Sequence, residues 1–137
     1  MVDYRTHTDE DATTHTEQPA FAALTVVNLE KQASSVQQLY KNFVLVNVNA
    51  HCVRMAVMQG EYRWHKHPDS DECFLVLEGE LEIDLRAGKT VRLRPGETFI
   101  IPAGTVHRTR SHIRTVNLCF EQKSAYTNVI FEDGQAC

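Results

Sequence analysis

The pattern of apolar and polar positions changes near residue 43. Residues 1–20 carry mostly Thr, Asp, Glu and His and almost no large apolar side chains. Such a segment cannot bury enough surface to offset the entropy lost on ordering, so we expect a mobile, disordered tail. The apolar run over 21–27 predicts a first strand, and residues 28–40 predict a short helix or a turn-rich linker with Asn28 as a candidate cap.

From residue 43 onward the pattern is typical of β structure. The segment FVLVNVNAHCVRMAVM is rich in β-branched residues and has a polar break near residues 47–50, so it predicts two strands. Shorter segments follow, closed by glycines and separated by prolines: YRWHKH, ECFLVLEG, ELEIDLRAG, TVRLRPG, ETFIIPAG, VHRTRSH and RTVNLCFE. Many short strands with this punctuation predict an all-β sandwich or barrel.

One of these segments shows strict alternation, which predicts a strand with one dry face and one wet face. Its apolar and its acidic side chains take turns along the chain: Leu81, Ile83 and Leu85 against Glu80, Glu82 and Asp84. We find no internal repeat and no interior linker, so residues 21–137 are expected to form a single domain.

Composition and charge exclude several classes of partner. The chain has 137 residues, a formal net charge of −4 and a hydrophobic fraction of 42%, which suit one folded domain and give no basic surface for nucleic acid. No apolar run reaches the length of a membrane span, and the N-terminus has no apolar stretch typical of a signal peptide. We therefore expect a cytoplasmic protein whose four scattered cysteines are reduced thiols.

Two stretches carry the residues suited to chemistry. His65 and His67 lie two positions apart, so on a strand their imidazoles point to the same side. Glu72 follows the turn-forming sequence PDSD in an apolar strand, where an ionised carboxylate needs a cation for compensation. His107 opens the strand after a Pro–Gly turn. Three imidazoles and one carboxylate suit Fe, Mn, Ni, Zn, Co or Cu better than Ca or Mg.

The two stretches resemble the paired motifs of the cupin family, G-x5-H-x-H-x3–4-E-x6-G and G-x5-P-x-G-x2-H-x3-N. The first is matched from Gly60 to Gly79 with one residue fewer in its first gap. The second is matched from Gly96 to His107, with Ser111 at the position of the Asn. The close resemblance covers roughly residues 43–122. It implies a cupin double-stranded β-helix, a jelly-roll barrel that binds one divalent metal ion at His65, His67, Glu72 and His107.

Residues near these motifs have weaker assignments. His51 is expected to be a hydrogen-bonded core residue, or one that supports the metal ligands, rather than a fifth ligand. By alternation Glu61 and Arg63 share the face of His65 and Tyr62 does not, unless a bulge at the shortened gap reverses this. The remaining assignments are that Trp64 and Cys73 face away from the metal, Cys119 faces either way, His112 is exposed, and Arg108 and Arg110 are surface or interface charges.

The outward side chains also predict an assembly. Trp64, Cys73, Leu75 and Leu77 are turned away from the metal cavity and are mostly apolar, which favours a homodimer through the outer sheet face. Cover by residues 21–42 is the competing explanation.

For function, the resemblance implies either of two classes. The first is a metalloenzyme that acts on a small oxygen-bearing organic molecule with dioxygenase, isomerase or lyase chemistry. The second is a small-molecule or metal-binding module without turnover. The sequence favours the first, and His51, Glu61 and Tyr62 are its candidate acid–base groups.

Overall fold

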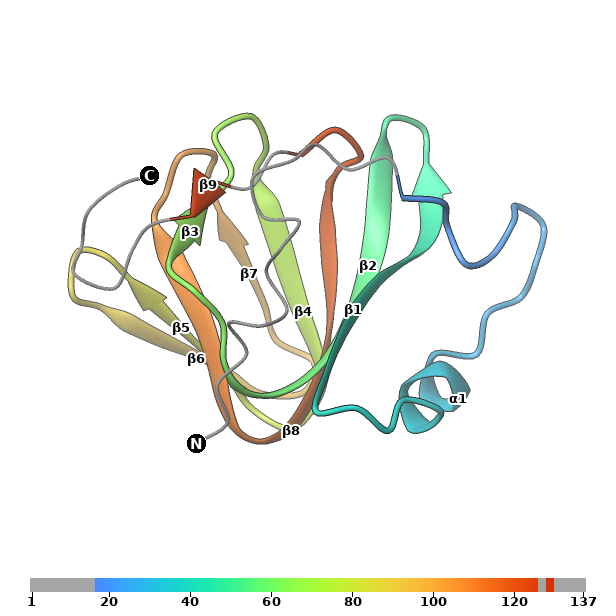
Figure 1. Cartoon of the computed structure of the whole chain (residues 1–137), viewed down its shortest axis with the longest axis horizontal. Coiled ribbons are helices and arrows are strands. Elements are labelled where there is room, and N and C mark those ends of the chain that lie inside the picture. Colours follow the sequence, from blue (N-terminus) through green and yellow to red (C-terminus); the bar gives the residue numbers. More distant parts are fainter. Residues whose placement is uncertain (1–16, 126–127, 130–137) are drawn as a thin grey trace.

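The computed structural model describes residues 17–125 and 128–129, which form one short helix and nine strands. The elements in chain order are α1 (Leu29–Ser34), β1 (Tyr40–Val48), β2 (His51–Glu61), β3 (His65–Lys66), β4 (Glu72–Glu78), β5 (Leu81–Leu85), β6 (Thr90–Leu93), β7 (Thr98–Ile101), β8 (His107–Gln122) and β9 (Asn128–Val129). Figure 1 shows the strands curving around a common interior, with α1 against the outside of β1.

The long strand β8 organises the barrel. One of its edges pairs antiparallel with β2 and then with β3, and its other edge pairs with β4 and β5. The chain segments VHRTRSH and RTVNLCFE, predicted as two strands, are therefore one continuous strand of 16 residues. Successive side chains of a strand point to opposite faces, so every second side chain along β8 faces the barrel interior.

Two hydrophobic clusters lie on opposite faces of this sheet. The inner cluster fills the barrel and includes Phe74, Val76, Leu81, Ile83 and Cys119. The outer cluster lies between the sheet and the N-terminal segment. It contains Leu45, Met55, Val57, Val116 and Leu118 together with Ala33 and Val36, and the partly buried Phe21, Val27, Leu29, Leu75 and Leu77 pack against it.

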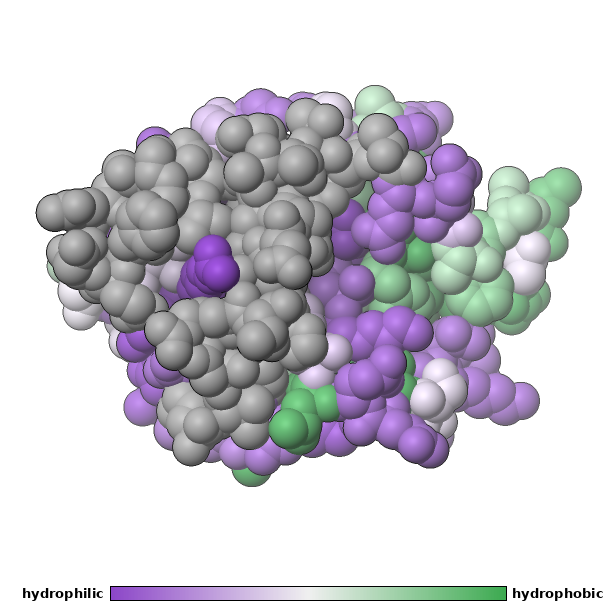
Figure 2. Space-filling view, viewed as in Figure 1, coloured by the Kyte–Doolittle hydropathy of each residue, from purple (hydrophilic) through white to green (hydrophobic). Residues whose placement is uncertain are grey.

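This outer cluster bears on the predicted homodimer. The outward side chains of Leu75 and Leu77, which motivated the dimer, pack under the segment that contains Phe21 and α1. The competing explanation, cover by residues 21–42, thus accounts for these two residues. Figure 2 shows hydrophobic surface over the segment before α1, which contains the exposed Leu24 and Val26, whereas the surface of α1 itself is mostly hydrophilic. The homodimer stays a prediction.

The N-terminal segment differs in part from its prediction. The helix and its cap are confirmed, because Asn28 Oδ1 accepts a hydrogen bond from Lys31 N at 2.8 Å. The strand predicted over 21–27 is wrong: the backbone turns there and Leu24 has a positive φ of 63°. The predicted tail lies outside the described residues up to position 16, whereas residues 17–20 are bound to the barrel through Ala20 N, which donates to Val44 O at 2.9 Å.

The predicted wet face of β5 is also wrong, although its dry face is confirmed. Glu82 and Asp84 are buried because arginines and one histidine cover them. Arg110 reaches both carboxylates, Arg108 and Thr90 bond Asp84, and Arg92 and the exposed His112 contact Glu82. Burial raises the pKa of Asp84, but hydrogen bonds from Arg110, Thr90 and Arg108 outweigh this and hold it well below its usual range.

The turn at Gly79 gives a stability prediction with a matched control. Gly79 and Gly88 both have positive φ, 85° and 98°, but a Cβ at Gly79 would lie 2.5 Å from Thr115 Oγ1 and 2.8 Å from Thr115 Cα, whereas nothing lies within 4 Å at Gly88. Both alanine variants carry the cost of left-handed backbone, and only Gly79→Ala adds a clash. Urea unfolding should show Gly79→Ala roughly 1–3 kcal/mol less stable than Gly88→Ala. Equal losses would contradict the close packing of Gly79 on β8.

Candidate metal centre

The structure brings the four predicted ligands together. His65 lies in β3 and is the register partner of His107, the first residue of β8. His67 follows β3, and Glu72 is the first residue of β4. All four side chains are buried, and their candidate ligand atoms lie within 4.8 Å of one another. Metal bonds of about 2.0–2.2 Å separate two ligand atoms by at most about 4.4 Å, so this set needs only a small contraction to hold one ion.

Backbone carbonyls orient two of the imidazoles. His65 Nδ1 lies 2.7 Å from Arg63 O, and His107 Nδ1 lies 2.9 Å from Thr105 O. A carbonyl oxygen can only accept, so in both rings Nδ1 carries the proton and donates. The lone pair of each Nε2 is therefore directed away from the backbone and is available to a metal ion.

The atoms at the centre of the cluster fit a cation. Among the residues that the structure describes, Glu72 Oε1 and His107 Nε2 are buried atoms without a hydrogen-bond partner, and they face each other at 3.3 Å. His67 Nε2 lies 3.2 Å from the same Glu72 oxygen. Without a metal, only a proton on these imidazole nitrogens can offset the carboxylate, whereas a positive ion between the nitrogens and the oxygen would do so with each ring as a lone-pair donor. The mixed set of nitrogen and oxygen donors fits a divalent transition metal.

Protonation in the cluster already favours the ligand state. Burial, followed by the neighbouring His107 and His67, holds the pKa of His65 well below its usual range, so this imidazole is neutral at pH 7. Burial alone would raise the pKa of Glu72, but His67 and His107 lower it well below its usual range. A neutral imidazole and an ionised carboxylate are the forms that bind a metal.

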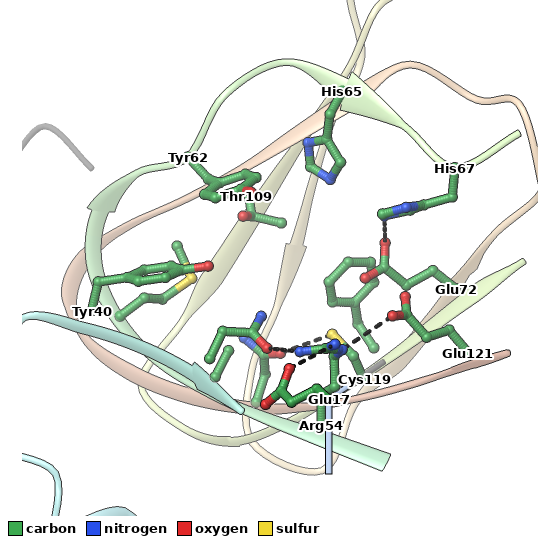
Figure 3. A pocket seen from close by; sticks show the side chains of 15 residues that line it. Glu17, Tyr40, Arg54, Tyr62, His65, His67, Glu72, Thr109, Cys119 and Glu121 are labelled. Atoms are coloured by element: carbon green, nitrogen blue, oxygen red, sulfur yellow. Dashed lines mark hydrogen bonds and ion pairs between the residues drawn. The ribbon is translucent and has the colours of Figure 1, made fainter. Parts of the chain in front are cut away.

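A cavity of about 100 Å³ adjoins the cluster inside the barrel. Figure 3 shows His65, His67 and Glu72 along one side of this cavity, with Glu121 beside Glu72, Tyr62 and Tyr40 on another side, and Arg54 and Glu17 below them. Tyr62 stacks on Tyr40 with ring centroids 5.8 Å apart and meets His65 edge-on at 5.0 Å. The candidate metal ligands thus border a partly open cavity lined by both polar and apolar side chains.

For the residues before His65, the alternative of a bulge that reverses the alternation is the one observed. Tyr62, not Glu61, lines the cavity beside His65, because the pairing of β2 with β8 shifts between Met58 and Gly60 and the chain then leaves the strand. Glu61 instead reaches Arg108 at 3.7 Å. The core or supporting position predicted for His51 is wrong: this residue is exposed and away from the site, since Arg54, Ala56 and Met58 face the cavity and strand alternation turns His51 outward.

The remaining neighbours follow the predicted orientations. Cys73 does not line the cavity, and its thiol contacts Thr98 Oγ1 at 3.3 Å. Cys119, whose direction was left open, lines the cavity, and burial followed by the charge of Glu72 raises the pKa of its thiol well above the usual range. Arg108 stacks over Trp64 at 5.1 Å, outside the cavity. Ser111 donates to Met58 O at 3.3 Å, which supports a structural role for that position.

The sequence analysis did not identify two polar residues that line the cavity. Arg54 is buried in β2 and Glu121 in β8. Burial and the charge of Glu72 raise the pKa of Glu121 to about 7, even though His67 and Arg54 oppose this. A signal was present in the sequence, because Arg54 interrupts the otherwise apolar run around VRMAVM. A charge within such a strand is a candidate for a buried ion pair.

Comparisons with known proteins agree with this fold and cluster. A family model described as "Cupin domain" matches residues 53–115. The uncharacterized protein YdbB of Bacillus subtilis (strain 168) is 55% identical over 105 residues, 77% of this chain and 93% of that protein. A cupin-2 domain containing protein from Shewanella frigidimarina superposes with a TM-score of 0.67 at 30% identity, over 71% of this chain and 94% of that one.

A more distant structure is the DMSP lyase DddQ of Ruegeria pomeroyi, with a TM-score of 0.55 at 23% identity over 65% of this chain and 49% of that one. Its likeness shows the fold alone. The chain belongs to the cupin family, and the predicted double-stranded β-helix is confirmed. Among the residues placed in the structure, no helix is both long and apolar enough to cross a membrane.

The cluster predicts one metal ion per chain. Elemental analysis of protein purified without chelators should find near-stoichiometric transition metal in the parent and very little in a His65→Ala, His67→Ala double variant, since two of four donors are lost. The matched control is the double variant His51→Ala, His112→Ala, which removes two exposed histidines outside the cluster and should keep its metal. Equal metal in both double variants would contradict the site.

The same ligands predict how metal stabilisation depends on pH. The folded chain keeps His65 neutral while an unfolded histidine gains a proton below about pH 6.5, so metal-free protein loses stability as the pH falls through that value. Protons compete with bound metal for the imidazole nitrogens, so the stabilisation by metal is present at pH 7.5 and is lost toward pH 5. Each tenfold excess of free metal over Kd adds about 1.4 kcal/mol.

Calorimetric melting should therefore show a gap in Tm between loaded and metal-free protein at pH 7.5 that shrinks toward pH 5. The variant His107→Gln should lose most of the gap, whereas His112→Gln, altered at an exposed histidine, should keep it. If loaded and metal-free protein melt together at pH 7.5, the metal assignment is wrong.

Proposed function

We propose that this cupin is a metal-dependent enzyme that acts on a small oxygen-bearing organic molecule, with dioxygenase, isomerase or lyase chemistry. One observation carries the proposal: three of the four candidate ligands border a cavity inside the barrel that is also lined by an ionisable side chain, Tyr62. Four protein donors on a six-coordinate ion leave about two positions for other ligands. A transition metal bound there would activate dioxygen, polarise a carbonyl or enediol, or acidify a bound water.

The residues of the chain supply the remaining requirements. The inner hydrophobic cluster closes one end of the barrel, so a molecule in the cavity is shielded from water on that side. His51, Glu61 and Tyr62 were the candidates for the acid–base role. Tyr62 takes this role, since it is the one of the three that lines the cavity. Its position beside His65, held by the stack on Tyr40, lets its phenol hold or move a proton at a molecule bound next to the ligand set.

The cellular location is proposed on the cysteines. Cys52, Cys73 and Cys119, the cysteines among the described residues, form no disulfide. Free thiols are typical of a reducing compartment, which supports the cytoplasm as the place where the protein acts.

Tyr62 provides the experiment. Metal-loaded protein is incubated with a panel of small hydroxy, keto and enol compounds, and turnover is followed by mass spectrometry. For any compound turned over, Tyr62→Phe should lower kcat by about 10²–10⁴-fold while metal content is unchanged. The matched control is Tyr40→Phe, which also loses one hydroxyl next to the cavity and should retain most of the activity.

Two outcomes would overturn the proposal in different ways. Saturable binding of a panel compound without turnover would favour a binding module. Turnover that survives Tyr62→Phe would leave an enzyme but would remove Tyr62 from its chemistry.

A further inference from the structure

Arg54 is a buried cation in the wall of the cavity that the metal ligands border. It lies in β2 on the cavity face and its side chain is 8% exposed. Its Nε donates to Glu121 Oε2 at 3.2 Å, and one terminal nitrogen donates to Asn42 Oδ1 at 2.9 Å. The other terminal nitrogen donates to Glu17 Oε1 at 3.2 Å. A guanidinium withdrawn from water in this way is suited to bind a carboxylate.

Glu17 differs from the other two partners of Arg54. Asn42 and Glu121 belong to barrel strands, whereas Glu17 lies in the segment before α1 and its side chain is 39% exposed. Its second oxygen, Oε2, accepts a hydrogen bond from Val44 N at 3.1 Å. Arg54 and the Val44 amide thus form a pair of donors that holds one carboxylate from outside the barrel.

Glu17 also stands between the cavity and the surface. Glu17 and Arg54 line the cavity and, in addition, a neighbouring surface depression that includes Lys123. Withdrawal of Glu17 would therefore leave Arg54 accessible from both sides and the Val44 amide accessible from the depression.

The charges of the interior leave a place for one anion. A divalent ion at the cluster and the guanidinium of Arg54 would carry three positive charges, and the carboxylates of Glu72 and Glu121 carry at most two negative ones, because the pKa of Glu121 is raised to about 7. With the ion bound, at least one positive charge would remain, and the Glu17 carboxylate on Arg54 offsets it. A buried net charge is costly, so the site left by Glu17 favours an anion over a neutral group.

We propose that Arg54 and the Val44 amide form a binding site for the carboxylate of a small organic acid, and that Glu17 occupies this site when no acid is bound. The acid would extend from these donors toward His65, His67 and Glu72, so the inference rests on the proposed metal site and specifies its substrate class. One water needs roughly 10–15 Å³ of cavity, so about 100 Å³ accommodates roughly seven to ten heavy atoms, the size of a short hydroxy or keto acid.

The test uses the metal-loaded full chain and isothermal titration with 3-hydroxypropionate and with its amide, which has the same shape and no charge. Glu17→Gln removes the internal competitor. If Glu17 holds the site about nine-tenths of the time, its removal raises the apparent affinity for the acid about tenfold. The affinity for the amide should not change.

The matched control is Glu80→Gln. Glu80 is exposed to a similar degree, 36%, and also pairs with an arginine, Arg94 at 3.3 Å, but it does not line the cavity. This variant should bind the acid like the parent. An equal gain in both variants would indicate a general effect of net charge and would overturn the inference.

The second arm removes the cation. The double variant Arg54→Gln, Glu121→Gln removes the guanidinium together with its buried partner, so Glu121 is not left as an unpaired buried carboxylate. The preference for the acid over its amide should then disappear. Retention of that preference would mean that the acid binds only through the metal ion, which overturns the inference. The Glu17→Gln arm decides the matter if this double variant does not fold.

Metal analysis of every sample separates the two proposals. A parent chain without metal refutes the proposed function. A parent with metal whose acid affinity depends on neither Glu17 nor Arg54 refutes only the carboxylate site, and Glu17 is then a structural contact of the N-terminal segment.

Discussion

The buried carboxylate of Glu72 constrains the rest of the site. An ionised group at 8% exposure must be compensated, and the nearest groups are imidazole nitrogens of His67 and His107 rather than an arginine or a lysine. The carbonyls of Arg63 and Thr105 fix the protons of His65 and His107 on the far side of their rings. The donor atoms of the cluster are thus arranged to bind a cation. A bound cation would compensate the carboxylate of Glu72, the first residue of the core strand β4.

The strand geometry of the barrel brings these residues together. β8 pairs with β3 at His107 and with β4 over the length of the inner cluster, so one strand places ligands from three segments around one point. The irregular pairing of β2 near Gly60 has a second effect, since it rotates the chain and turns Tyr62 into the cavity. A regular strand would have placed Glu61 there, next to Glu72, and would have added a second carboxylate to the site.

Most of the fold and the ligand set could be predicted because both depend on local pattern. Alternation and turn residues located the strands, and the spacing of His65, His67, Glu72 and His107 matched a known family. The errors arose where a distant contact overrides the local pattern. Glu82 and Asp84 alternate like surface residues, but arginines from β6 and β8 cover them. His51 has no local feature that distinguishes an inward from an outward position, and only the register of β2 decides it.

The inward-facing positions of the barrel differ between its two ends: they are apolar at one end and partly polar at the other. Toward the β5–β6 hairpin the inward residues are apolar, including Val76, Leu81 and Ile83, and form a continuous core. Toward the metal ligands the inward positions carry Arg54, Asn117 and Glu121. If stability alone mattered, a barrel of this size would have aliphatic side chains at these positions. Buried polar residues contribute less stability than the apolar residues they replace, so their presence on both β2 and β8 is better explained by a ligand than by the fold. Under the proposals made above, the metal ligands and Arg54 would act on one molecule, with its oxygen-bearing group at the former and its charge at the latter.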